Sequence, residues 1–145
     1  MKSRRLARLV RLRRLVEQSH ATDLQARKRS LEAAQVDLTR TLEQIEEVQD
    51  KPASSTVVEM LWRNSFEEHL EGEAEEQRGE VDVRELVVSE GEEIVKEAWQ
   101  RRRLLQHLQE RAEHREFEEA KSKSYREMDD MSLMRGHHDD RGEGK

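Results

Sequence analysis

The stretch from Trp62 to Arg135 contains no proline. Glu, Arg, Leu, Gln, Lys and Ala dominate it, so we predict one continuous α-helix over this length. At 1.5 Å per residue this helix would be roughly 110 Å long, which exceeds the diameter of a compact domain. A helix of that length needs a partner helix in water. The segment from Ser3 to Asp50 is a second helical stretch that can supply the partner.

Composition supports a coiled coil rather than a layered globular domain. Of the 145 residues, 33% are hydrophobic and 41% are charged. This is too little apolar material for a broad core, but it is enough for the narrow apolar seam between two helices. Disordered chains share this composition, and the heptad spacing of apolar residues distinguishes the two cases. We therefore predict an all-α fold of two long helices.

Apolar and small residues recur at heptad spacing in both predicted helices, as the seam of a coiled coil requires. The first helix carries two such series, which are Leu24, Leu31, Leu38 and Ile45, and then Ala34, Thr41 and Val48. The second helix carries Val81, Val88 and Val95, and then Ala98, Leu105 and Ala112. The seam weakens between Gly72 and Gly91, because each glycine costs roughly 1 kcal/mol in a helix relative to Ala. Whether the second helix is continuous there is left open.

The sole proline, Pro52, marks the turn between the helices, because the residue before a proline is biased away from helix. Ser54, Ser55 or Thr56 can cap the second helix, and Glu59 completes a capping-box pattern with Thr56. We predict a single antiparallel coiled-coil hairpin over residues 1–135, with helices 3–50 and 57–135 joined by a turn at 50–56. Residues 136–145 contain no apolar side chain and are predicted to be disordered.

The second helix is longer than the first, and this inequality predicts a docking surface. A hairpin centred near residue 53 places Ser3 beside Arg103 and leaves residues 104–134 as an overhanging C-terminal helix. Apolar side chains on an unpaired helix require cover from another protein. The overhang carries Leu104, Leu105, Leu108, Phe117, Tyr125, Met128, Met131, Leu133 and Met134.

Charge is strongly segregated along the chain although the net charge is only −6. Residues 1–14 carry seven Lys or Arg residues and no acid, whereas residues 67–97 are rich in Glu. The basic set can meet an acidic protein surface, an anionic membrane or nucleic acid. Aromatic residues, which commonly interleave nucleic-acid-binding stretches, are missing from the set, so we expect no nucleic-acid partner. In the hairpin, Arg101, Arg102 and Arg103 add to the charge at the same level.

The sequence gives little support for catalysis or cofactor binding. A two-helix rod has no concave, dry site that would perturb the pKa of a carboxylate, so we expect no enzymatic activity and no cofactor. The chain has no cysteine, which removes disulfides and cysteine-based metal sites. The His137–Asp140 stretch lacks the supporting residues of a selective metal site, so no metal is expected. No apolar run is long enough to span a membrane, and we expect a cytoplasmic protein.

Trp62 and Phe66 lie just after the predicted turn and admit two interpretations. They can form an exposed docking patch at the turn end, or they can pack against Ile45 and Val48 to close the hairpin. The residue pattern favours neither.

Three stretches together resemble the FliJ family of flagellar export proteins and its counterpart in virulence-type secretion systems (SctO/YscO). The first is the basic opening Leu-Ala-Arg-Leu-Val-Arg-Leu-Arg at residues 6–13. The second is the segment 98–111, in which an alanine and basic residues precede Leu-x-x-Leu-Gln-Glu-Arg. The third is Met128-Asp129-Asp130, where the family has an aspartate-glutamate pair.

The resemblance implies a non-enzymatic central stalk in the pore of a hexameric secretion ATPase, similar to the γ-subunit stalk of rotary ATP synthases. Implied partners are that ATPase, the cytoplasmic domain of the export gate and export chaperones. The implied location is the cytoplasmic face of the inner-membrane export apparatus, peripheral to the membrane through partners only. The alternative is a self-associating coiled-coil scaffold whose basic N-terminus binds anionic membrane or nucleic acid.

Two sets of residues are predicted to contact these partners. Trp62 and Phe66 form the set at the turn end. The set for the ATPase ring is Arg4, Arg5, Arg8, Arg11, Arg101, Arg102, Arg103, Leu104, Leu105, Leu108, Arg111, Met128 and Asp129.

Overall fold

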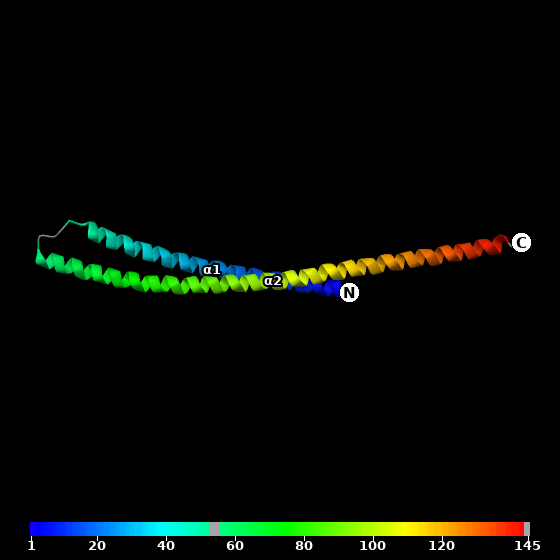
Figure 1. Ribbon diagram of the computed structural model, residues 1–145, viewed down its shortest axis with the longest axis horizontal. Helices are drawn as coiled ribbons and strands as arrows, with labels where there is room; N and C mark the ends of the chain where they lie inside the picture. The colour runs from blue at the N-terminus through cyan, green and yellow to red at the C-terminus, as the bar shows by residue number, and fades with distance from the viewer. Residues whose placement is uncertain (53–55, 144–145) are drawn as a thin grey trace. The chain divides into compact units, whose positions relative to one another are not determined.

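A computed structural model describes residues 1–52 and 56–143, and side chains as far as residue 137 (Figure 1). It contains two helices, α1 (Lys2–Asp50) and α2 (Val57–Glu143), and no strand within these residues. The two helices contact each other, so the predicted all-α fold of two long helices is confirmed. Thr56 caps α2, since its Oγ1 accepts a hydrogen bond from the Glu59 amide at 3.4 Å. Ser54 and Ser55, the other predicted caps, lie outside the described residues.

The C-terminal end of α2 differs from the prediction. We expected the helix to end at Arg135 and a disordered tail to follow, but α2 continues through Glu143. Gly136 keeps a negative φ, and no proline follows it, so nothing in the backbone interrupts the intrahelical hydrogen bonds. Gly144 and Lys145 lie outside the described residues.

Both helices contribute to two compact units. The first unit combines Met1–Arg14 with α2 from Gln100 onward, and the second comprises Leu15–Trp99. The docking surfaces predicted for the ATPase ring all lie on the first unit. The turn and the Trp62–Phe66 pair lie on the second.

In the second unit the two helices run antiparallel (Figure 1). The Arg27 Nη1 donates to the Val87 carbonyl at 2.8 Å. Further toward the turn, a guanidinium nitrogen of Arg63 donates to the Gln49 carbonyl at 3.1 Å. The partner position on α2 therefore falls as the position on α1 rises, which defines an antiparallel pair.

The core of the second unit is a narrow seam at heptad spacing, as the sequence predicts. On α1 the covered residues include Leu24, Leu31, Ala34, Leu38, Thr41, Ile45 and Val48. On α2 they include Leu70, Ala74, Gln77, Val81, Arg84, Val88, Gly91, Val95 and Ala98. The seam of α2 is thus unbroken through the glycine-containing stretch, and the helix is continuous there. Gly72 and Gly79 have no neighbouring atom within 4 Å of a built Cβ, whereas Gly91 faces α1.

Arg63 of α2 caps the C-terminal end of α1. The last four carbonyls of a helix have no intrahelical partner, and the last turn of α1 carries no basic residue of its own. The Arg63 guanidinium donates to the carbonyls of Val48, of Gln49 at 3.1 Å and of Pro52 at 3.3 Å. A cation at this end also complements the helix dipole. The pairing of the helices therefore begins at Arg63, in the second turn of α2.

The predicted register is wrong. Ser3 was expected beside Arg103, but in the first unit it hydrogen-bonds Glu116. Residues as far as Glu116 are consequently covered in part, with Ala112 buried and Leu105, Gln109 and Glu116 half-buried. The physical reason is that the first turns of α2, Val57–Trp62, are exposed and lie outside the seam, so the seam begins later in α2 than a hairpin centred near residue 53 assumes.

Candidate docking surfaces

The N-terminal turns of α1 present a cationic outer face in the first unit. Ser3 and Val10 are buried, so this side of the helix is covered. Five arginines of these turns are exposed, which are Arg4, Arg5, Arg8, Arg11 and Arg14. Leu9 and Leu12 lie between them and are 44% and 57% exposed. Exposed leucines beside arginines with no acid in residues 1–14 make a surface suited to a partner that is both anionic and apolar.

Glu116 of α2 caps the N-terminal end of α1. Its carboxylate accepts hydrogen bonds from the Ser3 amide at 3.2 Å and from the Ser3 hydroxyl at 2.5 Å. The hydrogen bonds from the Ser3 hydroxyl and amide, with smaller contributions from the N-terminal ammonium and Arg4, lower the pKa of the Glu116 carboxyl. The first amides of a helix lack intrahelical partners, and the first turn of α1 has no acid, so Glu116 supplies the missing negative charge.

This cap makes the first unit sensitive to acid. Because the pKa of Glu116 is lowered in the folded protein, its stabilising contribution is present above the ordinary value of 4.5 and is lost as the pH falls through the lowered pKa. We expect Glu116→Gln to lower the thermal midpoint near neutral pH, and the difference from the native chain to vanish in acid. Glu119→Gln, an exposed neighbour, is the matched control and should change neither. A constant difference at every pH would show that the charge of Glu116 is not involved.

The predicted ring contacts between Arg101 and Arg111 of α2 include both exposed and half-buried residues. Leu104 and Leu108 are exposed, and so are the arginines at 101, 103 and 111. Leu105 and Arg102 are half-buried, and Arg102 donates to the Gln106 side chain at 3.0 Å. The exposed members therefore face solvent, whereas Leu105 and Arg102 occupy seam positions.

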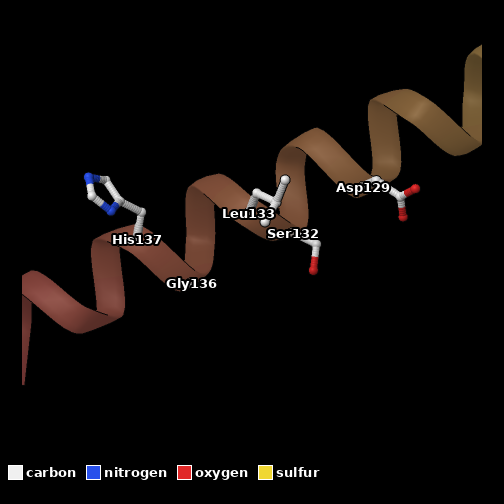
Figure 2. Close-up of a pocket in the computed structure, with 5 residues that line it drawn as sticks. All are labelled: Asp129, Ser132, Leu133, Gly136 and His137. Carbon is white, nitrogen blue, oxygen red and sulfur yellow. The ribbon is translucent and has the colours of Figure 1, made fainter.

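All residues from Phe117 to His137 are exposed. Phe117 is 65% exposed and Met128 63%, and Tyr125, Met131, Leu133 and Met134 are similar. A shallow groove on this stretch is lined by Asp129, Ser132, Leu133, Gly136 and His137, and Figure 2 shows the turns of α2 that carry them. All five residues come from successive turns of α2 itself, and no second element forms a wall. Such a groove can receive a side chain of a partner but does not enclose a substrate.

Trp62 and Phe66 form a stacked aromatic pair on the second unit. Their ring centroids lie 5.9 Å apart with the planes 8° from parallel. Trp62 is 73% exposed and Phe66 39%, and the preceding residues Val57, Val58, Met60 and Leu61 are exposed as well. Of the two interpretations, exposure favours a docking patch over packing against Ile45 and Val48.

Sequence reasoning missed Glu116 and Arg63, which cap the two ends of α1. The available signal was their position in the α2 seam. Glu116 lies four residues after Ala112. Arg63 lies four residues before Glu67, which lies three residues before Leu70. Among the described residues no cluster of His, Cys, Asp or Glu is suited to holding a metal ion. The side chains of His138, Asp139 and Asp140 lie outside the described set.

A protein built from two long, contacting helices with exposed cationic and apolar surfaces belongs to the class of coiled-coil interaction proteins. A family model described as Flagellar FliJ protein matches residues 1–141. The chain belongs to the flagellar FliJ family, whose members are non-enzymatic structural or chaperone-like components of flagellar protein export. No curated protein and no solved structure matches the chain. Neither helix, over the part of the chain described, is long and apolar enough to cross a membrane.

Proposed function

We propose that this chain is the central stalk of the flagellar protein export ATPase, which it enters through the first unit. The observation that carries the proposal is the exposure, on one unit, of the basic face of α1 and of the apolar residues from Phe117 to Met134. An ATPase ring with an acidic, partly apolar lining would complement both. The family membership supports an export-related role.

The mechanism is contact rather than chemistry. Arg4, Arg5, Arg8 and Arg11 attract the lining of the ring, and this electrostatic attraction speeds and orients the encounter. The C-terminal stretch beyond Glu116 overhangs the end of α1 and buries its apolar residues against the ring. A single asymmetric stalk contacts the subunits unequally, so it favours one arrangement of subunit interfaces and promotes both ring assembly and hydrolysis.

At the turn end, the stacked Trp62–Phe66 pair is the contact for the cytoplasmic domain of the export gate. Aromatic side chains on a rigid helix bury a large area at low entropic cost, which makes them effective anchors. Export chaperones are further partners that the family resemblance implies. The protein acts at the cytoplasmic face of the inner membrane and reaches the membrane through these partners.

Charge reversal tests the ring contact. The double variant Arg4→Glu and Arg8→Glu should weaken binding to the isolated export ATPase by about tenfold or more, because two attractive contacts become repulsive. The matched control is Arg29→Glu with Arg40→Glu, two exposed arginines of α1 in the second unit. Affinity is measured by titration at low and at high salt, since exposed charges are screened at high salt. Equal affinity of the two double variants would contradict the assignment of the basic face to the ring.

A further inference from the structure

Two arginines, Arg27 of α1 and Arg84 of α2, occupy seam positions where a coiled coil ordinarily has apolar residues. Each donates a hydrogen bond to a backbone carbonyl of the opposite helix. Arg27 Nη1 reaches the Val87 carbonyl at 2.8 Å, and Arg84 Nη1 reaches the Ser30 carbonyl at 2.8 Å. Arg84 also contacts Glu80 on its own helix at 2.6 Å. The two arginines therefore link the helices in a reciprocal way.

Small residues make room for both arginines. In a helix each carbonyl accepts from the amide four residues later, so the Val87 carbonyl faces Gly91 and the Ser30 carbonyl faces Ala34. A Cβ built on Gly91 would lie 3.0 Å from the Cδ of Arg27 and 3.1 Å from the Cδ1 of Leu24. Gly91 is thus the position at which the Arg27 side chain lies directly against the backbone of α2.

The spacing of these residues distinguishes the observed register from its neighbours. Arg27 and Ala34 are one heptad apart, and so are Arg84 and Gly91. Sliding α2 by one heptad in one direction would bring Arg84 to the place of Gly91, so that two arginines meet in the seam. Like charges at facing positions are destabilising. Sliding in the other direction would bring Ala98 to the place of Gly91 and put a Cβ in tight contact with the Arg27 side chain, which would have to shift.

The repeated valines of the α2 seam do not make this distinction. The α2 seam repeats Val81, Val88 and Val95 at intervals of seven, so a slide of one heptad replaces valine by valine. These valines therefore do not select the register by themselves, and a polar seam residue is an established device for doing so in coiled coils.

We propose that Arg27, Arg84 and Gly91 form a register lock, which restricts the two helices of the second unit to one of the pairings that their heptads permit. With the register lock in place, the two helices keep a fixed axial position relative to each other. The proposal rests on contacts within the second unit alone and does not depend on the stalk function.

The native chain has no cysteine, so engineered pairs report the register directly. Gly91 faces Arg27 in the observed register, and the helices are antiparallel. Gln77, two heptads before Gly91, therefore faces Thr41, two heptads after Arg27. The pair Gln77→Cys with Thr41→Cys reports this register. Gln77→Cys with Ala34→Cys reports the slide that brings Arg84 toward Arg27. Gln77→Cys with Val48→Cys reports the opposite slide. Each pair is treated with a short thiol-reactive crosslinker, and the crosslinked fraction is read from gel mobility.

In the native background we expect the 41–77 pair to crosslink predominantly. Arg84→Glu removes the hydrogen bond to the Ser30 carbonyl. In the register that brings position 84 opposite Arg27, it also replaces a repulsive charge by an attractive one. The variant should therefore raise the 34–77 crosslink severalfold. Arg78→Glu makes the same charge change on the exposed face of α2 and is the matched control. Helicity is measured for every variant. If Arg84→Glu loses helicity, Arg84→Leu removes the donor and the charge while keeping an apolar seam residue, and the same rise is expected.

Two results would overturn the lock. One is comparable crosslinking of all three pairs in the native background, which would mean that the helices slide freely. The other is a crosslinking pattern in the folded Arg84 variant that matches the pattern of Arg78→Glu, which would mean that other contacts set the register.

Discussion

A chain that ends at Glu116 is expected to fold as the full chain does but to have lost all stimulation of the export ATPase. The exposed residues Phe117–His137 cover no part of the seam, so their removal leaves the paired helices intact. The cap that Glu116 provides to Ser3 is also kept. What is removed is the apolar surface that we propose the ring to cover. The measurements are ATP hydrolysis with saturating truncated protein, and helicity of the truncated protein alone.

The choice of end point matters for this truncation. A chain that ends at Arg103 would also lack Ala112 and Glu116, and its N-terminal turns would then lose their covering helix. A chain that ends at Arg135 keeps Phe117 through Met134 and is the matched control, which should stimulate as the full chain does. Full stimulation by the chain that ends at Glu116 would place the ring contact elsewhere.

The largest effect on stability is expected from Leu70→Ala. Leu70 is only 3% exposed, and it lies in the part of the seam where its neighbour Ala74 is small. Truncating a buried leucine removes its transfer free energy and leaves a cavity, which costs about 2–5 kcal/mol. The free energy of unfolding is measured by denaturant titration with helicity as the signal.

Leu86→Ala is the matched control, because it makes the same substitution on the same helix at a side chain that is 67% exposed. Its effect should lie within about 0.5 kcal/mol. Equal losses for Leu70→Ala and Leu86→Ala would show that the change acts through helix propensity and that the seam is not the core.

The helices and the seam could be predicted from the sequence because both depend on local spacing. Val81, Val88 and Val95 repeat at seven, and Pro52 marks the break between the helices. The end of α2 could not be predicted, because Gly136 is compatible with either a continuing or an ending helix. The register depends on individual contacts such as that of Arg27 at Gly91, which a repeating pattern does not contain.

The charge of the docking surfaces could be predicted from the sequence, but the exposure of each residue could not. Charge segregation identified the basic face of α1, and those arginines are exposed. The wrong register assigned Leu105 to the overhang, whereas it is half-buried, and it concealed the contact between Glu116 and Ser3. An error of register moves the boundary between covered and exposed residues along a helix, so site predictions inherit it.

The stalk function is tested most directly by the ATP hydrolysis rate of the organism's own flagellar export ATPase, with and without this protein, together with the mass of the protein in solution. We expect a clear increase in rate caused by a protein that is monomeric on its own. An unchanged rate together with a stable homodimer would contradict it, and would favour a self-associating scaffold that uses its basic face on an anionic membrane or nucleic acid.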